Sequence, residues 1–129
     1  MEVELEDIPV MYLISPSGPQ GAGEAFKKLE DAIKWQLKGR KFYGTMFSGE
    51  YRVCLAITEP REPEKLGFPT WTIPGGKYFK DKIKDWEKHI LEIAPKFQEI
   101  ISKVNYDQSR PIIEFYRSQA ELCLLVPIK

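Results

Sequence analysis

The feature that most constrains the fold of this chain is an order of predicted elements that occurs twice. Each half of the sequence predicts a strand, an amphipathic helix and two strands joined by a tight turn, in that order. Proline and charged residues crowd the segment between the halves, TEPREPEKLGFP, which predicts a solvated linker or crossover. We therefore expect one duplicated domain that spans residues 1–129, with pseudo-repeats at about 1–58 and 68–129.

The first half opens with an apolar run at residues 3–14, and Pro9 inside it is typical of an edge strand or of a strand entered after a bend. A helix is predicted from Gly23 to near Gly39, because apolar residues recur there at helical spacing. Its apolar positions are Phe26, Leu29, Ile33 and Leu37. The half closes with a predicted hairpin whose turn starts with glycine. The parts of this hairpin are residues 41–48, the pair Gly49-Glu50 and residues 51–57.

The second half begins with a β-rich run at residues 70–80, in which the pair Gly75-Gly76 predicts a bulge or a close approach of two backbone segments. A long helical pattern follows at residues 86–104. Because Pro95 lies inside this pattern, we expect one bent helix or two helical segments. The chain closes with a second hairpin. Its parts are residues 111–117, a polar turn around Ser118-Gln119 and residues 121–128.

Together these elements predict an α+β fold with a mostly antiparallel sheet, in which both helices cover one face. The opposite face would then carry side chains that meet across the pseudo-twofold axis between the repeats. Concave surfaces of this kind are common ligand sites. We therefore expect a ligand cleft at the axis, on the face that the helices leave open.

Charge and composition exclude several classes of function. Nineteen Lys and Arg residues balance nineteen Asp and Glu residues, so we expect no direct binding of nucleic acid. The chain shows neither a signal sequence nor an apolar run as long as a membrane span, which predicts a cytoplasmic protein without a membrane partner. His89, Cys54 and Cys123 lack the spacing of a metal site, and no cofactor fingerprint occurs, so we expect neither metal nor cofactor.

The acidic residue Glu114 is the leading candidate for a site residue. Strand alternation places Ile112, Glu114 and Tyr116 on one face of the predicted strand, and Ile113 and Phe115 on the other. A carboxylate among large apolar residues is costly to bury unless it is protonated, hydrogen-bonded or facing a cation. Glu114 is therefore either an anchor for a ligand or an ordinary residue on a solvated face.

Aromatic residues gather on the other predicted strands in greater number than a small core needs. Rings arranged around a carboxylate suit a planar or cationic organic ligand, because stacking and cation–π attraction add to apolar burial. In the simpler interpretation, part of these rings pack under the helices. The candidate ligand-binding residues are Glu114, Tyr43, Tyr51, Trp71, Tyr78 and Tyr116.

Several segments resemble the GyrI-like small-molecule-binding domains, a family also described as AraC-type effector-binding or SOUL-like. In the second half these are TWTIPGGKYFK, the helix that follows it, IIEFYRS and LLVPIK; in the first half they are SGPQGAGEAFKKLEDAIK and YRVCLAIT. The resemblance implies a doubled strand-helix-strand-strand fold and, for Glu114, the family's acidic residue that contacts cationic ligands. The segment EIAPKFQEIISKV replaces a Trp-Leu-Pro type segment of the family, so the rim of the cleft is expected to differ.

Three functions follow from this resemblance. The preferred one is a stand-alone effector-binding domain, which senses or sequesters a small hydrophobic, cationic or planar compound, as in multidrug-responsive transcription regulators. The alternative is a metal-independent hydrolase of cyclopropane-containing or other toxic compounds, with Glu114 as general base and Tyr51 as proton donor. The third is an interaction protein whose partner is gyrase or a DNA-binding regulator.

Overall fold

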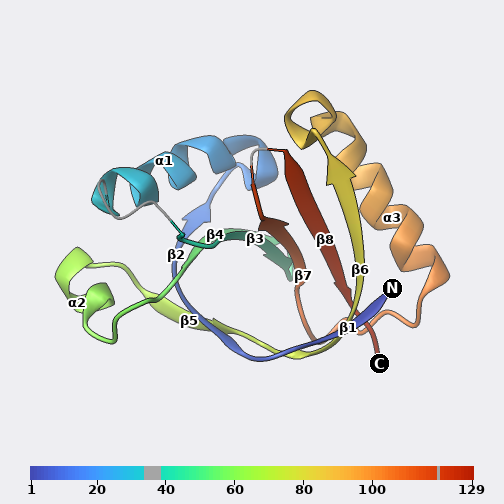
Figure 1. The fold of residues 1–129 in the computed structure, drawn as a ribbon, viewed down its shortest axis with the longest axis horizontal. Helices are drawn as coiled ribbons and strands as arrows, with labels where there is room; N and C mark the ends of the chain where they lie inside the picture. The colour runs from blue at the N-terminus through green and yellow to red at the C-terminus, as the bar shows by residue number, and fades with distance from the viewer. Residues whose placement is uncertain (34–38, 119) are drawn as a thin grey trace.

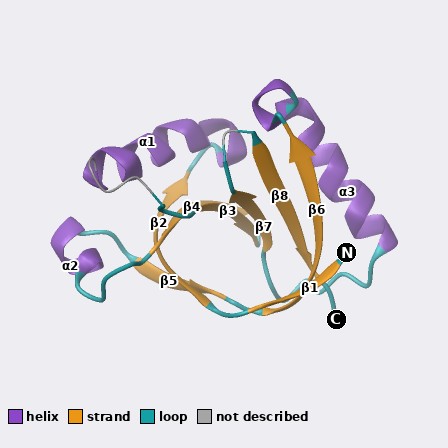
Figure 2. Cartoon of the chain, viewed as in Figure 1, coloured by secondary structure: helices purple, strands orange, loops and turns teal. Residues whose placement is uncertain are grey.

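The structure is a computed structural model, and it describes residues 1–33, 39–118 and 120–129. Within these ranges the chain forms one eight-stranded antiparallel sheet and three α-helices (Figure 2), so the predicted α+β class is confirmed. The strands are β1 (Glu2–Leu5), β2 (Ile8–Ser15), β3 (Phe42–Phe47), β4 (Glu50–Ala56), β5 (Thr70–Ile73), β6 (Gly76–Lys84), β7 (Ile112–Tyr116) and β8 (Glu121–Pro127). The helices are α1 (Ala22–Ile33), α2 (Glu62–Leu66) and α3 (Ile93–Lys103), with 3-10 turns η1 (Gly18–Gly21), η3 (Trp86–Lys88) and η4 (Ile90–Glu92).

The order of the strands is symmetric about the centre of the sheet. The strands lie in the order β1-β6-β8-β7-β3-β4-β2-β5 (Figure 1). Counted outward from the centre, β7, β8 and β6 on one side correspond to β3, β4 and β2 on the other. The predicted duplication is therefore visible in the strand order, and its pseudo-twofold axis passes between β3 and β7.

The sheet curls because its two ends are joined. β1 and β2 follow one another directly in the chain, as do β5 and β6, yet β1 pairs with β6 while β2 pairs with β5. The two segments run past each other at Gly75, where an added Cβ atom would lie 2.8 Å from the backbone nitrogen of Asp7. The close backbone approach predicted from Gly75-Gly76 is thus confirmed, and no residue larger than glycine fits there.

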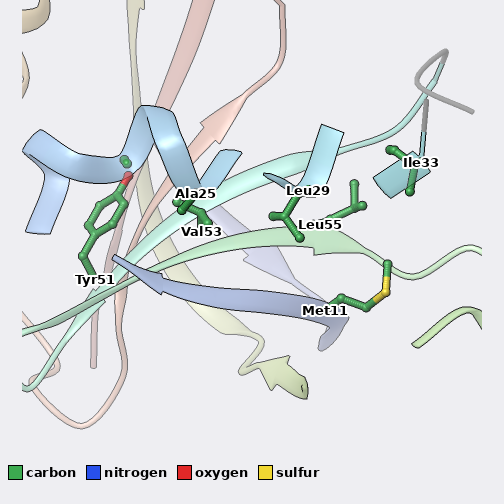
Figure 3. Close-up of a cluster of buried hydrophobic side chains, with 8 residues drawn as sticks. Met11, Ala25, Leu29, Ile33, Tyr51, Val53 and Leu55 are labelled. Atoms are coloured by element: carbon green, nitrogen blue, oxygen red, sulfur yellow. The ribbon is translucent and has the colours of Figure 1, made fainter. Parts of the chain in front are cut away.

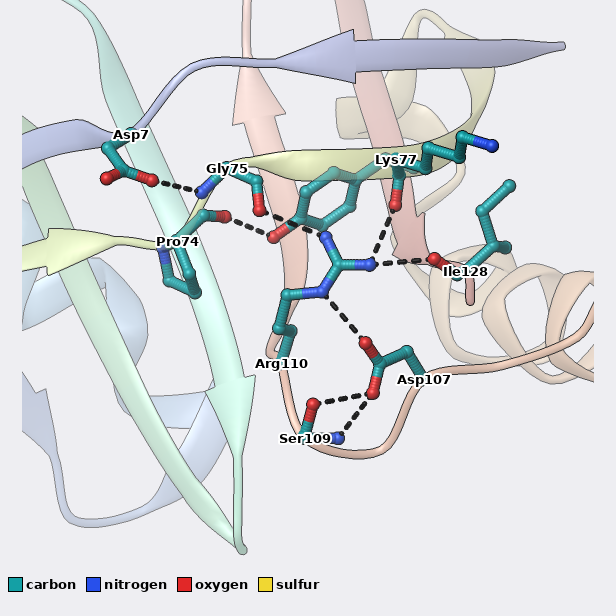
Figure 4. A network of polar contacts seen from close by, with 9 residues as sticks. Asp7, Pro74, Gly75, Lys77, Asp107, Ser109, Arg110 and Ile128 are labelled. Carbon is teal, nitrogen blue, oxygen red and sulfur yellow. Dashed lines mark hydrogen bonds and ion pairs between the residues drawn. The ribbon is translucent and has the colours of Figure 1, made fainter.

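An arginine fastens this crossing to the end of the chain (Figure 4). The guanidinium of Arg110 donates hydrogen bonds to the carbonyl oxygens of Gly75, Lys77 and Ile128, at 2.7 to 3.1 Å. Its Nε atom donates to Asp107 at 3.0 Å, and its carbon atom Cζ lies 4.9 Å from the centre of the Tyr78 ring. Because these partners come from three distant segments, Arg110 has a structural role in holding the curl closed.

Both long helices cover the same face of the sheet, as predicted. Ala25, Leu29 and Ile33 of α1 pack on Val53 and neighbouring residues of the first half (Figure 3). In the second half, Phe97 and Ile100 of α3 pack in the same way on a buried cluster that includes Leu122, Leu124 and Val126. Each helix therefore stabilises its own half through apolar burial.

The opposite face lies inside the curl, and it is filled. Its buried cluster combines side chains of the central strands with side chains of the segments that cross below them. The buried members are Val10, Tyr43, Cys54, Ile73, Tyr78, Ile113 and Leu125. The prediction that this face carries the ligand cleft is therefore wrong, because the pairing of β1 with β6 and of β2 with β5 turns the face into a core.

The first hairpin differs by one residue from the prediction. Phe47 pairs with Glu50, so the turn residues are Ser48 and Gly49 rather than Gly49-Glu50. Their φ angles are 51° and 79°, both in the left-handed region. This is the pattern of a turn with two left-handed residues, whose twist matches that of the flanking strands.

The linker between the halves is more ordered than predicted. It contains α2, and Glu62 at the start of this helix accepts hydrogen bonds from Arg40 at 2.8 and 2.9 Å. The two side chains are only 6% and 5% exposed. The prediction of a wholly solvated linker is wrong, because one of its charges finds a buried partner.

The predicted helical pattern at residues 86–104 is divided in the structure, and the predicted first helix is described only as far as Ile33. α1 ends its described part at Ile33, and the predicted apolar position Leu37 lies outside the described residues. In the second half, Pro95 lies in the first turn of α3, after the two 3-10 turns, so the prediction of separate helical segments is confirmed. None of the helices in the described part of the chain is long and apolar enough to cross a membrane.

Candidate functional site

A cavity of about 510 Å³ lies over the centre of the sheet, between α1 and α3. It occupies the pseudo-twofold axis, as expected, but on the face that carries the helices. The helices cover the outer parts of the two halves and leave the β3–β7 boundary between them open. The lining residues are Ala22, Gly23 and Phe26 of α1, Gly44 and Met46 of β3, Tyr51 of β4, Trp86, Ile90, Ile93, Ala94, Phe97 and Gln98 of the second helical region, and Ile112, Glu114 and Tyr116 of β7.

Glu114 lies on the floor of this cavity. In the sheet it stands between Gly44 of β3 and Leu124 of β8, and its exposed fraction is 8%. Ile112 and Tyr116 line the same cavity, whereas Ile113 and Phe115 belong to the cluster inside the curl. The alternation predicted for this strand is therefore confirmed, and Glu114 is not on a solvated face.

Two tyrosines hold one oxygen of this carboxyl group. Tyr51 and Tyr116 both donate their phenol protons to Oε1 of Glu114, the latter at 2.9 Å. The two phenol oxygens are themselves 3.3 Å apart. No hydrogen bond from a described residue is made to Oε2.

A glycine makes room for this arrangement. A Cβ atom added to Gly44 would lie 2.6 Å from Oε1 of Glu114 and 2.8 Å from Cζ of Tyr51. Real Cβ atoms do not approach other heavy atoms so closely, so the phenol of Tyr51 reaches Glu114 only because residue 44 has no side chain. The sequence analysis missed Gly44, although a lone glycine within a strand is a signal for close approach.

Burial decides the electrostatics of the site. Desolvation raises the pKa of Glu114 above its ordinary value, although the hydrogen bonds from Tyr51 and Tyr116 act in the opposite direction. Burial, followed by the negative charge of Glu114, raises the pKa of both phenols well above 10. The phenols therefore remain protonated donors. Among the described side chains that line the cavity, Glu114 is the only Asp, Glu, Lys, Arg or His.

Aromatic rings form the walls next to Tyr116. The ring of Phe26 meets it edge-on at 5.1 Å between centroids, and the ring of Trp86 does so at 5.2 Å. Trp86 is held in place by a hydrogen bond from its Nε1 atom to the carbonyl oxygen of Ser118, at 3.0 Å. In the sequence, Phe26 belongs to an apolar stripe and Trp86 begins the helical pattern at residues 86–104, and helical spacing does not show that such a stripe extends past the core.

Three of the predicted site residues lie elsewhere. Tyr43 is inside the curl, where its ring stacks on Phe115 at 5.0 Å. Tyr78 is fully buried there and donates to the carbonyl oxygen of Pro74 at 2.6 Å. Trp71 lines a second hollow on another part of the surface, and its ring contacts the guanidinium of Arg52. The structure therefore brings together Glu114, Tyr51 and Tyr116, but not Tyr43, Trp71 or Tyr78.

The described residues contain no cluster of three or more His, Cys, Asp and Glu side chains that could hold a metal ion. His89 lies at the surface and pairs with Glu92. Cys54 is buried, and burial raises the pKa of its thiol to about 12. These groups lie outside the cavity lining.

Comparison with known proteins shows similarity of fold. No family model matches the chain, and no curated protein matches its sequence. Among solved structures, the Vibrio cholerae integron cassette protein VCH_CASS2 is similar with a TM-score of 0.77 and 14% identity, over 100% of this chain and 95% of that one.

Two further structures are similar over the whole chain. SAV2435, solved bound to tetraphenylphosphonium, has a TM-score of 0.65 and 12% identity, with 93% of its chain covered. A hydrolase from Listeria innocua has a TM-score of 0.60 and 12% identity, with 90% of its chain covered. At such identities the likeness shows a shared fold.

Proposed function

We propose that this protein binds a hydrophobic organic cation in the cavity between α1 and α3, and that Glu114 neutralises the charge of the ligand. The observation that carries this proposal is a carboxyl group that is 8% exposed in a cavity whose other described lining residues are uncharged. An ionised carboxylate in apolar surroundings is costly without a partner of opposite charge. A cationic ligand would supply that partner.

The shape and lining of the cavity support the same ligand class. Its volume of about 510 Å³ lies within the range usual for small-molecule sites. Aromatic faces and edges next to Tyr116 suit a ligand with several rings, because stacking and cation–π contacts each contribute about 1 kcal/mol. The similar fold of SAV2435, bound to tetraphenylphosphonium, a bulky aromatic cation, supports the proposal further.

We also propose that the chain is a GyrI-like effector-binding domain that senses or sequesters drug-like compounds. The IIEFYRS segment that carries the resemblance contains Glu114 and Tyr116, and both lie at the cavity. A role in transcription regulation or an interaction with gyrase remains a prediction.

Hydrolysis is the second candidate. Glu114 and Tyr51 are neighbours at the cavity, so a general base and a proton donor would both lie within reach of one bound molecule. The fold is also that of the Listeria innocua hydrolase. In this alternative, Glu114 would take a proton from water and Tyr51 would protonate the leaving group.

Thermal unfolding with added ligand tests the proposal. A compound that binds the native state raises the unfolding midpoint. We expect tetraphenylphosphonium to raise the midpoint of the wild-type protein and of a control, Glu99→Gln, whose side chain lies on the exposed side of α3. The variant Glu114→Gln should lose most of this shift.

The same variants separate binding from hydrolysis. If a cyclopropane-bearing ester is cleaved by the wild-type protein but not by Glu114→Gln, while both bind it equally, the result supports hydrolysis as the function. If tetraphenylphosphonium shifts neither the wild-type protein nor Glu99→Gln, the cavity does not bind cations of this kind.

A further inference from the structure

We propose that Glu114 carries a proton when the cavity is empty and that capture of a cation expels this proton to the solvent, so that binding is proton-coupled. This deepens the proposed function, on which it rests, by stating how the charge state of the site is regulated.

The first argument is the pattern of hydrogen bonds at the carboxyl group. Tyr51 and Tyr116 both donate to Oε1, and no described donor meets Oε2. An ionised carboxylate spreads its charge over two oxygens and accepts hydrogen bonds at both. A neutral carboxyl group needs donors only at its carbonyl oxygen, because its other oxygen carries the proton. Both donors lie on Oε1, so they leave Oε2 able to carry the proton of the neutral form, with Oε1 as the carbonyl, although the same hydrogen bonds by themselves favour the ionised form.

The second argument is the absence of a compensating charge among the described residues around the cavity. The titratable groups that face Glu114 are the phenols of Tyr51 and Tyr116. The elements α1, β3, η3, η4 and α3 contribute apolar side chains, glycines and the amide of Gln98 to the lining.

In the second helical region (η3, η4 and α3), Glu87 and Lys88 lie outside the cavity lining, and the other titratable side chains form pairs away from the cavity. These pairs are Lys96 with Asp81, Lys103 with Glu99, and His89 with Glu92. None of these six residues belongs to the cavity lining. Before a ligand arrives, protonation is therefore the available way to neutralise Glu114. The raised pKa of Glu114, caused by its burial, agrees with this geometry.

The exchange balances without any further reactant. The O–H bond at Oε2 breaks, its electron pair stays on the carboxylate, the proton passes to water or buffer, and the cation takes its place beside Oε2. The cavity is neutral before and after the event, so neither state leaves a lone charge in apolar surroundings.

Proton coupling has a definite sign. Where the empty site is protonated, a rise of one pH unit should strengthen the binding of a permanent cation by up to about tenfold. Above the pKa of the empty site the affinity should level off. A neutral ligand that accepts a hydrogen bond from the protonated carboxyl should show the reverse trend and bind best at low pH.

Calorimetric titration with tetraphenylphosphonium tests the inference directly. The titration is made from about pH 5 to about pH 8, in pairs of buffers with different ionisation enthalpies, so that any proton released appears as a difference in heat. This cation has no titratable group, so a released proton must come from the protein. We expect up to about one proton released per bound cation at the acidic end, falling towards zero as the pH rises.

Two outcomes would overturn different statements. Binding with the same affinity at every pH, and without proton release, would refute proton coupling and leave the proposed function in place. Absence of binding at every pH would refute the proposed function itself.

Glu99→Gln, on the exposed side of α3, should release protons as the wild-type protein does. Glu114→Gln should bind weakly with no buffer-dependent heat, and release by that variant would assign the proton to another group.

Discussion

Replacing Gly44 by alanine should disrupt the candidate site from within the sheet. The added methyl group would lie 2.6 Å from Oε1 of Glu114 and 2.8 Å from Cζ of Tyr51, where ordinary contacts are about 3.4 Å or longer. The backbone of β3 is held between β4 and β7, so the side chain of Tyr51 must move instead. We expect its phenol to leave Glu114 and to enter the cavity.

The expected change in the free energy of unfolding follows from the hydrogen bond that Gly44→Ala removes and from the overpacking that it introduces. A hydrogen bond to the neutral carboxyl group contributes about 0.5 to 1.5 kcal/mol, and overpacking of a core costs about 1 to 3 kcal/mol. Replacement of glycine also restricts the unfolded chain, which offsets about 0.4 to 1 kcal/mol. The net loss in the free energy of unfolding should be roughly 0.5 to 4 kcal/mol.

Urea unfolding followed by circular dichroism measures this loss, and calorimetry measures the affinity for tetraphenylphosphonium. Gly23→Ala is the matched control for stability, because a Cβ atom there meets nothing within 4 Å and the residue lies in α1. Because Gly23 lines the cavity, affinity is compared with that of the wild-type protein. This control should keep or gain up to about 1 kcal/mol of stability through helix propensity. If Gly44→Ala matched Gly23→Ala in stability and the wild-type protein in affinity, the role assigned to Gly44 would be refuted.

Three further predictions concern the charge of Glu114, the aromatic wall of the cavity and the packing of α1 on the sheet. Because the folded pKa of Glu114 is raised, the unfolded chain ionises first as the pH rises, and the wild-type protein loses stability from about its ordinary pKa of 4.5 up to the folded value. Glu114→Gln should therefore be the more stable protein at neutral pH, by about 1.4 kcal/mol per unit of raised pKa, and the advantage should vanish in acid; an advantage that grows in acid would contradict this sign. Trp86→Ala should weaken binding of tetraphenylphosphonium by roughly tenfold in calorimetry, whereas Trp71→Ala should leave it unchanged, and equal effects would refute the placement of the cavity. Leu29 is fully buried on the side of α1 that faces the sheet, and Leu29→Ala should lower the free energy of unfolding in urea by about 2 to 5 kcal/mol. A loss within the roughly 0.5 kcal/mol of an ordinary surface substitution would contradict the packing of α1 on the sheet.

Local rules predicted those features that depend on neighbouring residues. Helical spacing identified both long helices, and alternation along β7 placed Glu114 and Tyr116 on one face, where the cavity is found. Gly75 was also identified correctly, since a glycine pair within a β-rich run has few explanations other than a bend or a close backbone approach.

Features that depend on distant pairing could not be predicted in the same way. Which face stays open is decided by the pairing of β1 with β6 and of β2 with β5, between segments about seventy residues apart. This pairing encloses Tyr43 and Tyr78 and leaves Trp71 on another surface. The burial of Glu62 also depends on a distant partner, because Arg40 lies 22 residues earlier, in the segment that precedes β3.

The most direct test of the central claim compares two ions of nearly the same shape and opposite charge. Calorimetric titrations of the wild-type protein with tetraphenylphosphonium and with tetraphenylborate would be made at neutral pH. Charge neutralisation by Glu114 predicts that the cation binds and that the anion does not. Equal binding of both ions, or unchanged binding of the cation to Glu114→Gln, would show that the cavity selects for shape alone and would contradict the account.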